Sequence, residues 1–117
     1  MNYIELNKRI LVTFKRKLNG EGKMKKVNDE AVPGLEYSLL VLTAVSKYYE
    51  LIDDDENRRA KNAYYKTAKL LRDKIKGSKK LKPLDDERVS GIMYSLTIMN
   101  NQRLFLCKSN QQSVEKK

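Results

Sequence analysis

Apolar residues recur at helical spacing along nearly the whole of this 117-residue chain. Apolar positions three, four and seven residues apart lie on one side of a helix, so each such segment predicts an amphipathic helix. Glycine and proline mark the ends of the segments, since glycine stops helices and proline is tolerated in a first turn. The sequence therefore predicts an all-α fold, a single-domain bundle of about four helices. The first helix ends at Gly20, and its inner side carries Tyr3, Ile10, Leu11, Phe14 and Leu18. The other three helices run from Pro33 to about Asp53, from Asp53–Glu56 to Lys76, and from Asp85–Glu87 to about Cys107.

The length and composition suit one hydrophobic core. Forty per cent of the residues are hydrophobic, which is enough to bury a core in a domain of this size. We expect one helical domain over residues 1–108 and a flexible polar tail over residues 109–117. Glu5, Lys8 and Arg9 interrupt the N-terminal segment, so no signal peptide is predicted there.

The second predicted helix contains the most apolar run of the chain, Leu39–Val45. Glu36 and Lys47 bound this run at about ten intervening residues, whereas a membrane-spanning helix needs about 20. The helix is apolar almost all round, which predicts that it forms the buried centre of the domain. A strand over the same run is the alternative on local propensity, but the neighbouring segments are all helical.

The net charge of +10 is unevenly distributed. Residues 56–82 carry 11 basic and 2 acidic side chains, and residues 1–26 carry 8 basic and 2 acidic ones. Residues 27–55 carry seven acids against Lys47 alone. A surplus concentrated in one segment favours a polyanionic partner over a generally basic surface.

The third predicted helix separates its apolar and basic residues onto two faces. Ala60, Ala63, Tyr64, Thr67, Leu71 and Ile75 form the stripe expected to pack inward. Arg58, Lys61, Tyr65, Lys69, Arg72 and Lys76 form one outward strip about 27 Å long, with Arg59 and Lys66 at its edge. Such a strip can follow a phosphate backbone without reading sequence, and Tyr65 could stack on a base of a single strand.

Two features distinguish this strip from an ordinary solvated helix face, on which Tyr65 would only lie across lysine stems. Asp73 is the single acid between residues 57 and 82, whereas solubilising faces usually mix both signs. The next segment adds Lys79 and Lys80. A second basic patch lies on the first helix and comprises Lys8, Arg9, Lys15 and Arg16. Whether it merges with the outward strip depends on the fold.

The fourth predicted helix is apolar on two sides. Its expected inward stripe is Val89, Ile92, Met93, Leu96, Met99 and Leu104, with Tyr94, Ile98 and Phe105 nearly opposite. A helix of this kind is either enclosed by the bundle or docked on another chain. The second possibility makes Tyr94, Ile98 and Phe105 candidate protein-interface residues. Gly91 lowers helix stability, and a close helix–helix approach would explain its presence.

The sequence argues against catalysis. It has no His, and its single Cys, Cys107, therefore lacks a candidate base. The acidic clusters Asp53–Glu56 and Asp85–Glu87 could supply oxygen ligands, but both fit the starts of helices, where acidic side chains cap free N–H groups. No glycine-rich phosphate loop is present. We expect no enzymatic activity, no cofactor and no bound metal.

No motif ties the chain to a family, so no residue role is carried over. In size, helicity and charge it resembles the small helical subunits that line nucleic acid in CRISPR effector complexes. We expect a cytoplasmic, non-enzymatic subunit that binds a nucleic-acid backbone, single-stranded or within a ribonucleoprotein assembly, with protein partners or self-association and no membrane. The alternative is a protein-binding module, such as a phage or mobile-element inhibitor, that docks on an acidic surface of a host protein.

Overall fold

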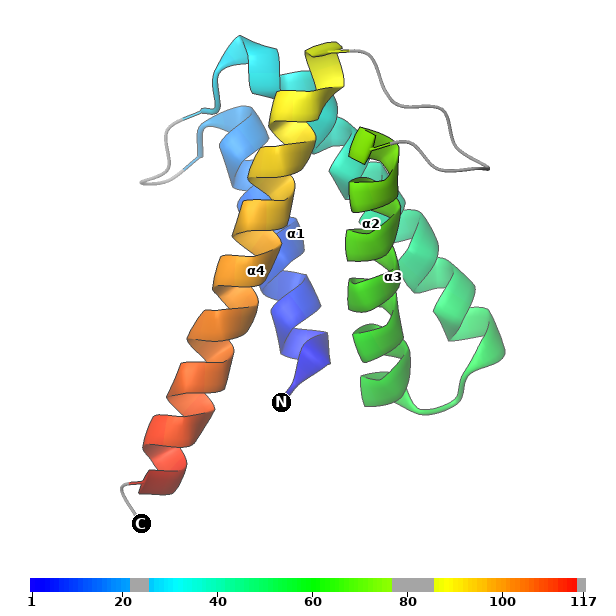
Figure 1. Ribbon diagram of the computed structural model, residues 1–117. Coiled ribbons are helices and arrows are strands. Elements are labelled where there is room, and N and C mark those ends of the chain that lie inside the picture. Colours follow the sequence, from blue (N-terminus) through cyan, green and yellow to red (C-terminus); the bar gives the residue numbers. More distant parts are fainter. Residues whose placement is uncertain (22–25, 77–85, 116–117) are drawn as a thin grey trace.

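The computed structural model is a bundle of four α-helices, as the sequence predicts (Figure 1). It describes residues 1–21, 26–76 and 86–115, and the side chains of residues 1–21, 26–76 and 89–108. The segment Leu39–Val45 is helical, so the strand alternative is wrong. The elements are α1 (Tyr3–Asn19), a short 3-10 helix η1 (Asp29–Ala31), α2 (Val32–Ile52), α3 (Glu56–Lys76) and α4 (Asp86–Glu115).

Local capping interactions account for the ends of α1. The side chain of Asn2 accepts a hydrogen bond from the backbone N–H of Glu5 at 3.0 Å. At the other end Gly20 adopts a left-handed backbone, with φ of 71°, and its N–H donates to the carbonyl of Arg16 at 2.7 Å. Glycine takes this conformation without the steric cost of a side chain, so the sequence itself stops the helix at this point.

The helices enclose one core to which all four contribute. Figure 1 shows α4 on the left and α3 to its right, with α1 between and behind them, and α2 running from behind the first turns of α4 to the right-hand edge, beyond α3. Burial of large aliphatic and aromatic side chains at the centre is the main stabilising contribution in such a bundle. The side chains with no exposed surface include Leu6, Ile10 and Phe14 from α1, Leu35 and Leu42 from α2, Leu71 from α3 and Ile92 from α4.

The backbones of α2 and α4 touch where the two helices cross. A Cβ atom added at Gly91 would lie 2.2 Å from the carbonyl oxygen of Ala31 and 2.7 Å from the Cα of Gly34. Small buried residues follow one turn later in each helix: the hydroxyl of Ser38 donates to the carbonyl of Gly34 at 3.0 Å, and that of Ser95 to the carbonyl of Gly91 at 2.8 Å. The close approach that the sequence suggested for Gly91 is confirmed.

The second helix is not buried all round, and that prediction is wrong. Its buried residues are Gly34, Leu35, Ser38 and Leu42, all in its first half. The second half of α2 diverges from the crossing with α4 and runs along the outer edge of the bundle (Figure 1). One face of the helix is therefore not covered by the parts of the chain that the structure describes. Its exposed apolar side chains are Leu40, Tyr48, Leu51 and Ile52.

The fourth helix is rotated relative to the prediction. The close contact at Gly91 turns Ile92, Ser95 and Met99 into the core and leaves Met93 and Leu104 exposed. This orientation differs by roughly a quarter turn from the one expected. The helix also runs to Glu115, past the end predicted near Cys107 and through most of the segment expected as a polar tail.

We expect Gly91→Ala to destabilise the protein. The added methyl group meets backbone atoms of α2 that cannot move aside, and overpacking of this kind costs about 1–3 kcal/mol. That cost exceeds the gain of up to about 1 kcal/mol in helix propensity. Chemical denaturation gives the free energy of unfolding. Thr97→Ser, at an exposed position of the same helix, keeps the hydroxyl that donates to the carbonyl of Met93; it is the control and should change the free energy of unfolding by less than about 0.5 kcal/mol. A Gly91→Ala variant as stable as the parent would contradict the close contact.

Candidate nucleic-acid interface

The third helix has the two faces that the sequence predicts. Ala63, Tyr64, Thr67 and Leu71 are buried, and Ala60 and Ile75 at the ends of the stripe are partly buried. The outward residues are exposed, and Lys66 is exposed at their edge, whereas Arg59 is partly buried. The exposed members of the strip are Arg58, Lys61, Tyr65, Lys69, Arg72 and Lys76.

Four of these cations have no acidic partner among the residues that the structure describes. The ion pairs in that part of the chain join Glu5 to Arg9, Asp53 to Arg58 and Glu56 to Arg59. The charge of the four cations is therefore available to a ligand. We refer to these four, with the tyrosine among them, as the α3 cationic strip: Lys61, Tyr65, Lys69, Arg72 and Lys76.

Arg58, in the first turn of α3, is paired with an acid and in this respect differs from the other cations of the predicted strip. Its guanidinium makes two hydrogen bonds to the carboxylate of Asp53, at 2.6 and 2.7 Å. These bonds and one from the backbone N–H of Asp55 lower the pKa of Asp53 to about 2. The carboxylate of Asp55 accepts the backbone N–H of Arg58 at 2.9 Å and so caps α3. The acidic cluster therefore serves as the helix start that the sequence predicted.

Arg59 is also held by this turn. Its guanidinium donates to the backbone carbonyl of Asp53 at 3.3 Å and lies 3.9 Å from the carboxylate of Glu56. It lines an open cavity of about 340 Å³ between α1, α2 and α3, together with Lys8, Glu50 and Glu56. Two acids balance two cations there, so the cavity does not extend the cationic surface.

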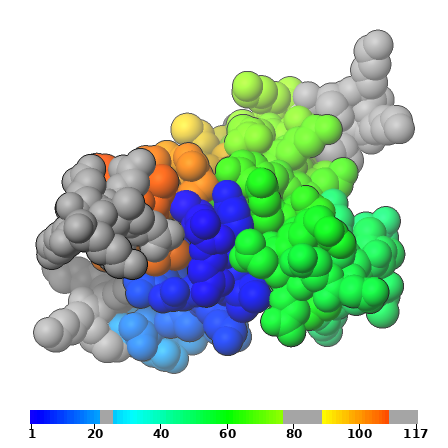
Figure 2. Space-filling view, turned by 90° about the horizontal axis from the view of Figure 1, so that it is seen from below, coloured from blue at the N-terminus to red at the C-terminus, as the bar shows by residue number. Residues whose placement is uncertain are grey.

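Tyr65 is anchored to a cluster of three tyrosines and does not simply lie across lysine stems. Its ring meets that of Tyr64 edge to face at 5.1 Å between centroids, and its hydroxyl lies 3.2 Å from that of Tyr3. Figure 2 shows the start of α1, which carries Tyr3, between α3 and α4. Burial and the hydrogen bond with Tyr65 raise the pKa of Tyr3 to about 12. Tyr65 keeps 44% of its surface exposed, so part of its ring remains open to a ligand.

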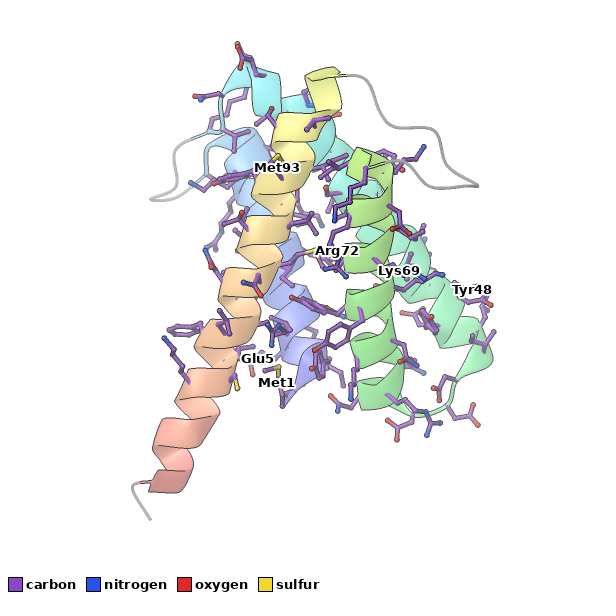
Figure 3. All side chains as sticks on the ribbon, in the orientation of Figure 1. Met1, Glu5, Tyr48, Lys69, Arg72 and Met93 are labelled. Atoms are coloured by element: carbon purple, nitrogen blue, oxygen red, sulfur yellow. The ribbon has the colours of Figure 1, made fainter. Side chains whose placement is uncertain are left out.

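Arg103 on α4 adds a cation that the sequence analysis missed. Burial raises the pKa of both Tyr3 and Tyr64, and the guanidinium of Arg103 partly offsets that rise, since a positive charge near the cluster favours the phenolate. The positive charge of Arg72 also acts to lower the pKa of Tyr64. Figure 3 shows Arg72 between α3 and α4. The spacing along α4 could have indicated Arg103. It follows Met99 by four residues and so lies on the helix side that carries the predicted inward stripe.

The basic patch on α1 does not merge with the α3 cationic strip. Lys8, Arg9, Lys15 and Arg16 are all exposed, as the predicted patch requires. The opposite side of α1 faces the other helices and contacts α3 through the hydrogen bond from Asn7 to the carbonyl of Ala60, at 2.9 Å. Arg9 and Arg16, on the side of α1 opposite that contact, therefore point away from α3, whereas Lys8 lines the cavity beside Arg59. Lys79 and Lys80 lie outside the described residues.

Arg9 is occupied by contacts within the protein. Its guanidinium is 3.1 Å from the carboxylate of Glu5 and 5.8 Å from the centroid of the Phe105 ring. A cation over an aromatic face at this distance is attracted by the ring. The predicted nucleic-acid residue and the predicted interface residue thus contact each other.

The predicted protein interface on α4 is not a continuous exposed face. Tyr94 and Ile98 are partly buried and pack against the core, because the rotation of α4 brings them to the flank of its buried side. Of the three predicted residues only Phe105 is largely exposed, at 58%. The candidate interface of the molecule is therefore the α3 cationic strip with the adjoining tyrosine cluster.

No protein-family model, curated protein or solved structure matches the chain. Among the described residues, no helix combines the length and hydropathy that a membrane span requires.

We expect Arg58→Gln to raise the pKa of Asp53 from about 2 toward its ordinary value near 3.9. Because folding lowers this pKa, the pair stabilises the folded state above about pH 4, and this contribution is lost as the pH falls toward 2. A carbon-13 NMR titration of the side-chain carboxyl measures the shift. Arg59→Gln is the matched control: Arg59 donates to the main-chain carbonyl of Asp53, and its charge lowers the pKa of the Asp53 carboxyl least of the causes, so the pKa should rise much less than in Arg58→Gln. An unchanged Asp53 pKa in Arg58→Gln would contradict the assigned pairing.

Proposed function

We propose that this protein is a non-enzymatic helical subunit that binds a nucleic-acid backbone without sequence specificity. The observation that carries the proposal is the α3 cationic strip, whose four cations are exposed and lack acidic partners among the described residues. Uncompensated cations repel one another, so their alignment weakens the folded state unless an anionic ligand binds them.

The shape of the strip suits a polyanion. From Lys61 to Lys76 it follows one line along α3 for about 22 Å, at 1.5 Å per residue. Lysine and arginine side chains on such a line can contact successive phosphates and release condensed counterions. Contacts of this kind position a backbone and carry no sequence information.

The tyrosine cluster favours a single-stranded ligand. Tyr65 stands between Lys61 and Lys69 on the strip, and Tyr64 and Tyr3 hold its ring in place. An immobilised aromatic ring among cations offers a stacking surface to an unpaired base, and stacking contributes about 1–3 kcal/mol per base. A base within a duplex is already stacked on its neighbours and cannot use this surface. The cluster therefore supports binding of single strands, alone or within a ribonucleoprotein assembly.

The proposal predicts a steep dependence of binding on salt. Four phosphate contacts to a single strand give a slope of log K against log salt concentration of about −3. Replacing Lys69, Arg72 and Lys76 by Glu removes three of the contacts and should reduce the slope to about −1, with at least about a tenfold loss of affinity at low salt. Fluorescence anisotropy with random-sequence single-stranded DNA and RNA at several salt concentrations measures both quantities.

The matched control replaces Lys15, Arg16 and Lys26 by Glu, which changes the net charge by the same amount. These three residues are exposed and lie outside the α3 cationic strip, so this variant should lose less affinity and keep most of the slope. Equal losses in the two variants would show that net charge alone causes binding, which contradicts the proposal. Binding of acidic proteins but not of nucleic acid would instead support docking on an acidic protein surface.

Replacing Tyr65 tests the preference for single strands. Tyr65→Leu keeps an apolar side chain but removes the ring, so we expect a loss of roughly 1–3 kcal/mol in binding a single strand and little change for a duplex. Tyr65→Phe retains the stacking surface and loses only the hydroxyl contact with Tyr3, so it should bind like the parent. The measurement is the ratio of affinities for single-stranded and duplex DNA. Equal losses for both ligands would exclude stacking on Tyr65.

A further inference from the structure

The open cavity between α1, α2 and α3 has an apolar lining of its own. Ile4 and Leu11 from α1 and Ala60 and Ala63 from α3 contribute to this lining. The volume of the cavity is about 340 Å³, near the lower end of the range of roughly 300–1,000 Å³ that is typical of small-molecule sites. The cavity therefore has room for a compact ligand with an apolar part.

A buried amide in this lining has an unused acceptor. Asn7 lines the cavity and is only 8% exposed, and its Nδ2 donates to the carbonyl of Ala60 at 2.9 Å. Its Oδ1 is buried and accepts no hydrogen bond from any described residue. A buried acceptor without a donor weakens the folded state, and such groups in native proteins call for an explanation. An N–H donor of a ligand in the cavity would satisfy this oxygen.

Charged side chains of both signs line the same cavity. Lys8 on α1 and Glu50 on α2 are exposed and form no ion pair with any described residue, so both charges are available to a ligand. Arg59 is held in place by its bond to the carbonyl of Asp53 at 3.3 Å and by Glu56 at 3.9 Å, and its guanidinium has further N–H donors. The lining thus offers two cations to an anionic group and Glu50 to a cationic one.

This mixture of charges selects the class of ligand. A monoanion would leave Glu50 without a partner, and a simple amine would be repelled by Lys8 and Arg59. A zwitterion with an apolar side chain suits every part of the lining. Its carboxylate can accept charge-assisted hydrogen bonds from the two cations. Its ammonium group has three N–H donors, enough for both Glu50 and Asn7, and its side chain can pack on Leu11.

We propose that the cavity between α1, α2 and α3 is a binding site for a free aliphatic α-amino acid. Lys8 and Arg59 hold the carboxylate of the ligand, and Glu50 and Asn7 hold its ammonium group. The cavity and the α3 cationic strip share no residue, so the proposal is independent of nucleic-acid binding.

Three ligands with the same branched alkyl group test the need for both charges. L-Leucine carries both, isocaproate carries only the carboxylate, and isoamylamine carries only the ammonium group. Each is titrated into the full-length nitrogen-15-labelled protein, and the backbone NMR signals of Ala60 and Ala63 give the dissociation constant. We expect L-leucine to bind at least about tenfold more tightly than either of the others, because only L-leucine pairs with both signs of charge. The side-chain amide signal of Asn7 should shift as its oxygen gains a donor.

Conservative variants test the assigned residues. Glu50→Gln and Lys8→Gln should each weaken L-leucine binding at least about threefold, since each removes one charged contact at an exposed position. Glu36→Gln on α2 and Lys15→Gln on α1 are the matched controls. Both of these residues are exposed and lie outside the cavity, so both variants should bind L-leucine like the parent. The same spectra confirm that each variant is folded.

Three outcomes would overturn the proposal. The first is the absence of a saturable shift of the cavity signals with L-leucine. The second is binding of isocaproate or isoamylamine as tight as that of L-leucine, since one charge would then suffice. The third is an equal effect of Glu50→Gln and Glu36→Gln, since the position of the acid would then not matter.

Discussion

The contact between the backbones of α2 and α4 at Gly34 and Gly91 is the constraint on which the arrangement of the bundle depends. A methyl group at position 91 would lie 2.2 Å from a carbonyl oxygen of the facing chain, so only glycine permits this crossing. The crossing sets the rotation of α4, which directs Ile92 into the core and Met93 to the surface. It also sets the direction in which α2 leaves the crossing, and Leu51 near the end of α2 is 86% exposed.

The acidic turn between α2 and α3 sets the orientation of the α3 cationic strip. Only three residues join Ile52 to Glu56, and both acidic side chains that bond Arg58 lie among them. The short connection returns α3 along α2 and holds its first turn in one orientation. Thr67 and Leu71 then face the core, and the lysines between and beyond them face the solvent.

The core does not explain two surfaces, and they differ in chemistry. On α3 the exposed cations lack described acidic partners, although mixed charges would stabilise the helix better. On α2 the exposed side chains are apolar, with Leu40 and Leu51 the most exposed among them. The alignment of cations on α3 weakens the isolated protein to a small extent and is compensated when an anionic ligand binds.

Sequence alone determined what depends on neighbouring residues in the chain. It predicted the four helices, the stop at Gly20, the acidic start of α3 at Asp53–Glu56 and the two faces of α3, since one strongly amphipathic pattern allows only one orientation. Most of the α3 cationic strip could therefore be predicted. Tertiary structure decided the rest. A helix that is apolar on two sides, as α2 and α4 are, has no unique inner face until another backbone packs against it. The pairing of Arg58 with Asp53 and the effect of Arg103 on Tyr64 could not be predicted either. Both depend on distances between side chains that only the folded chain fixes.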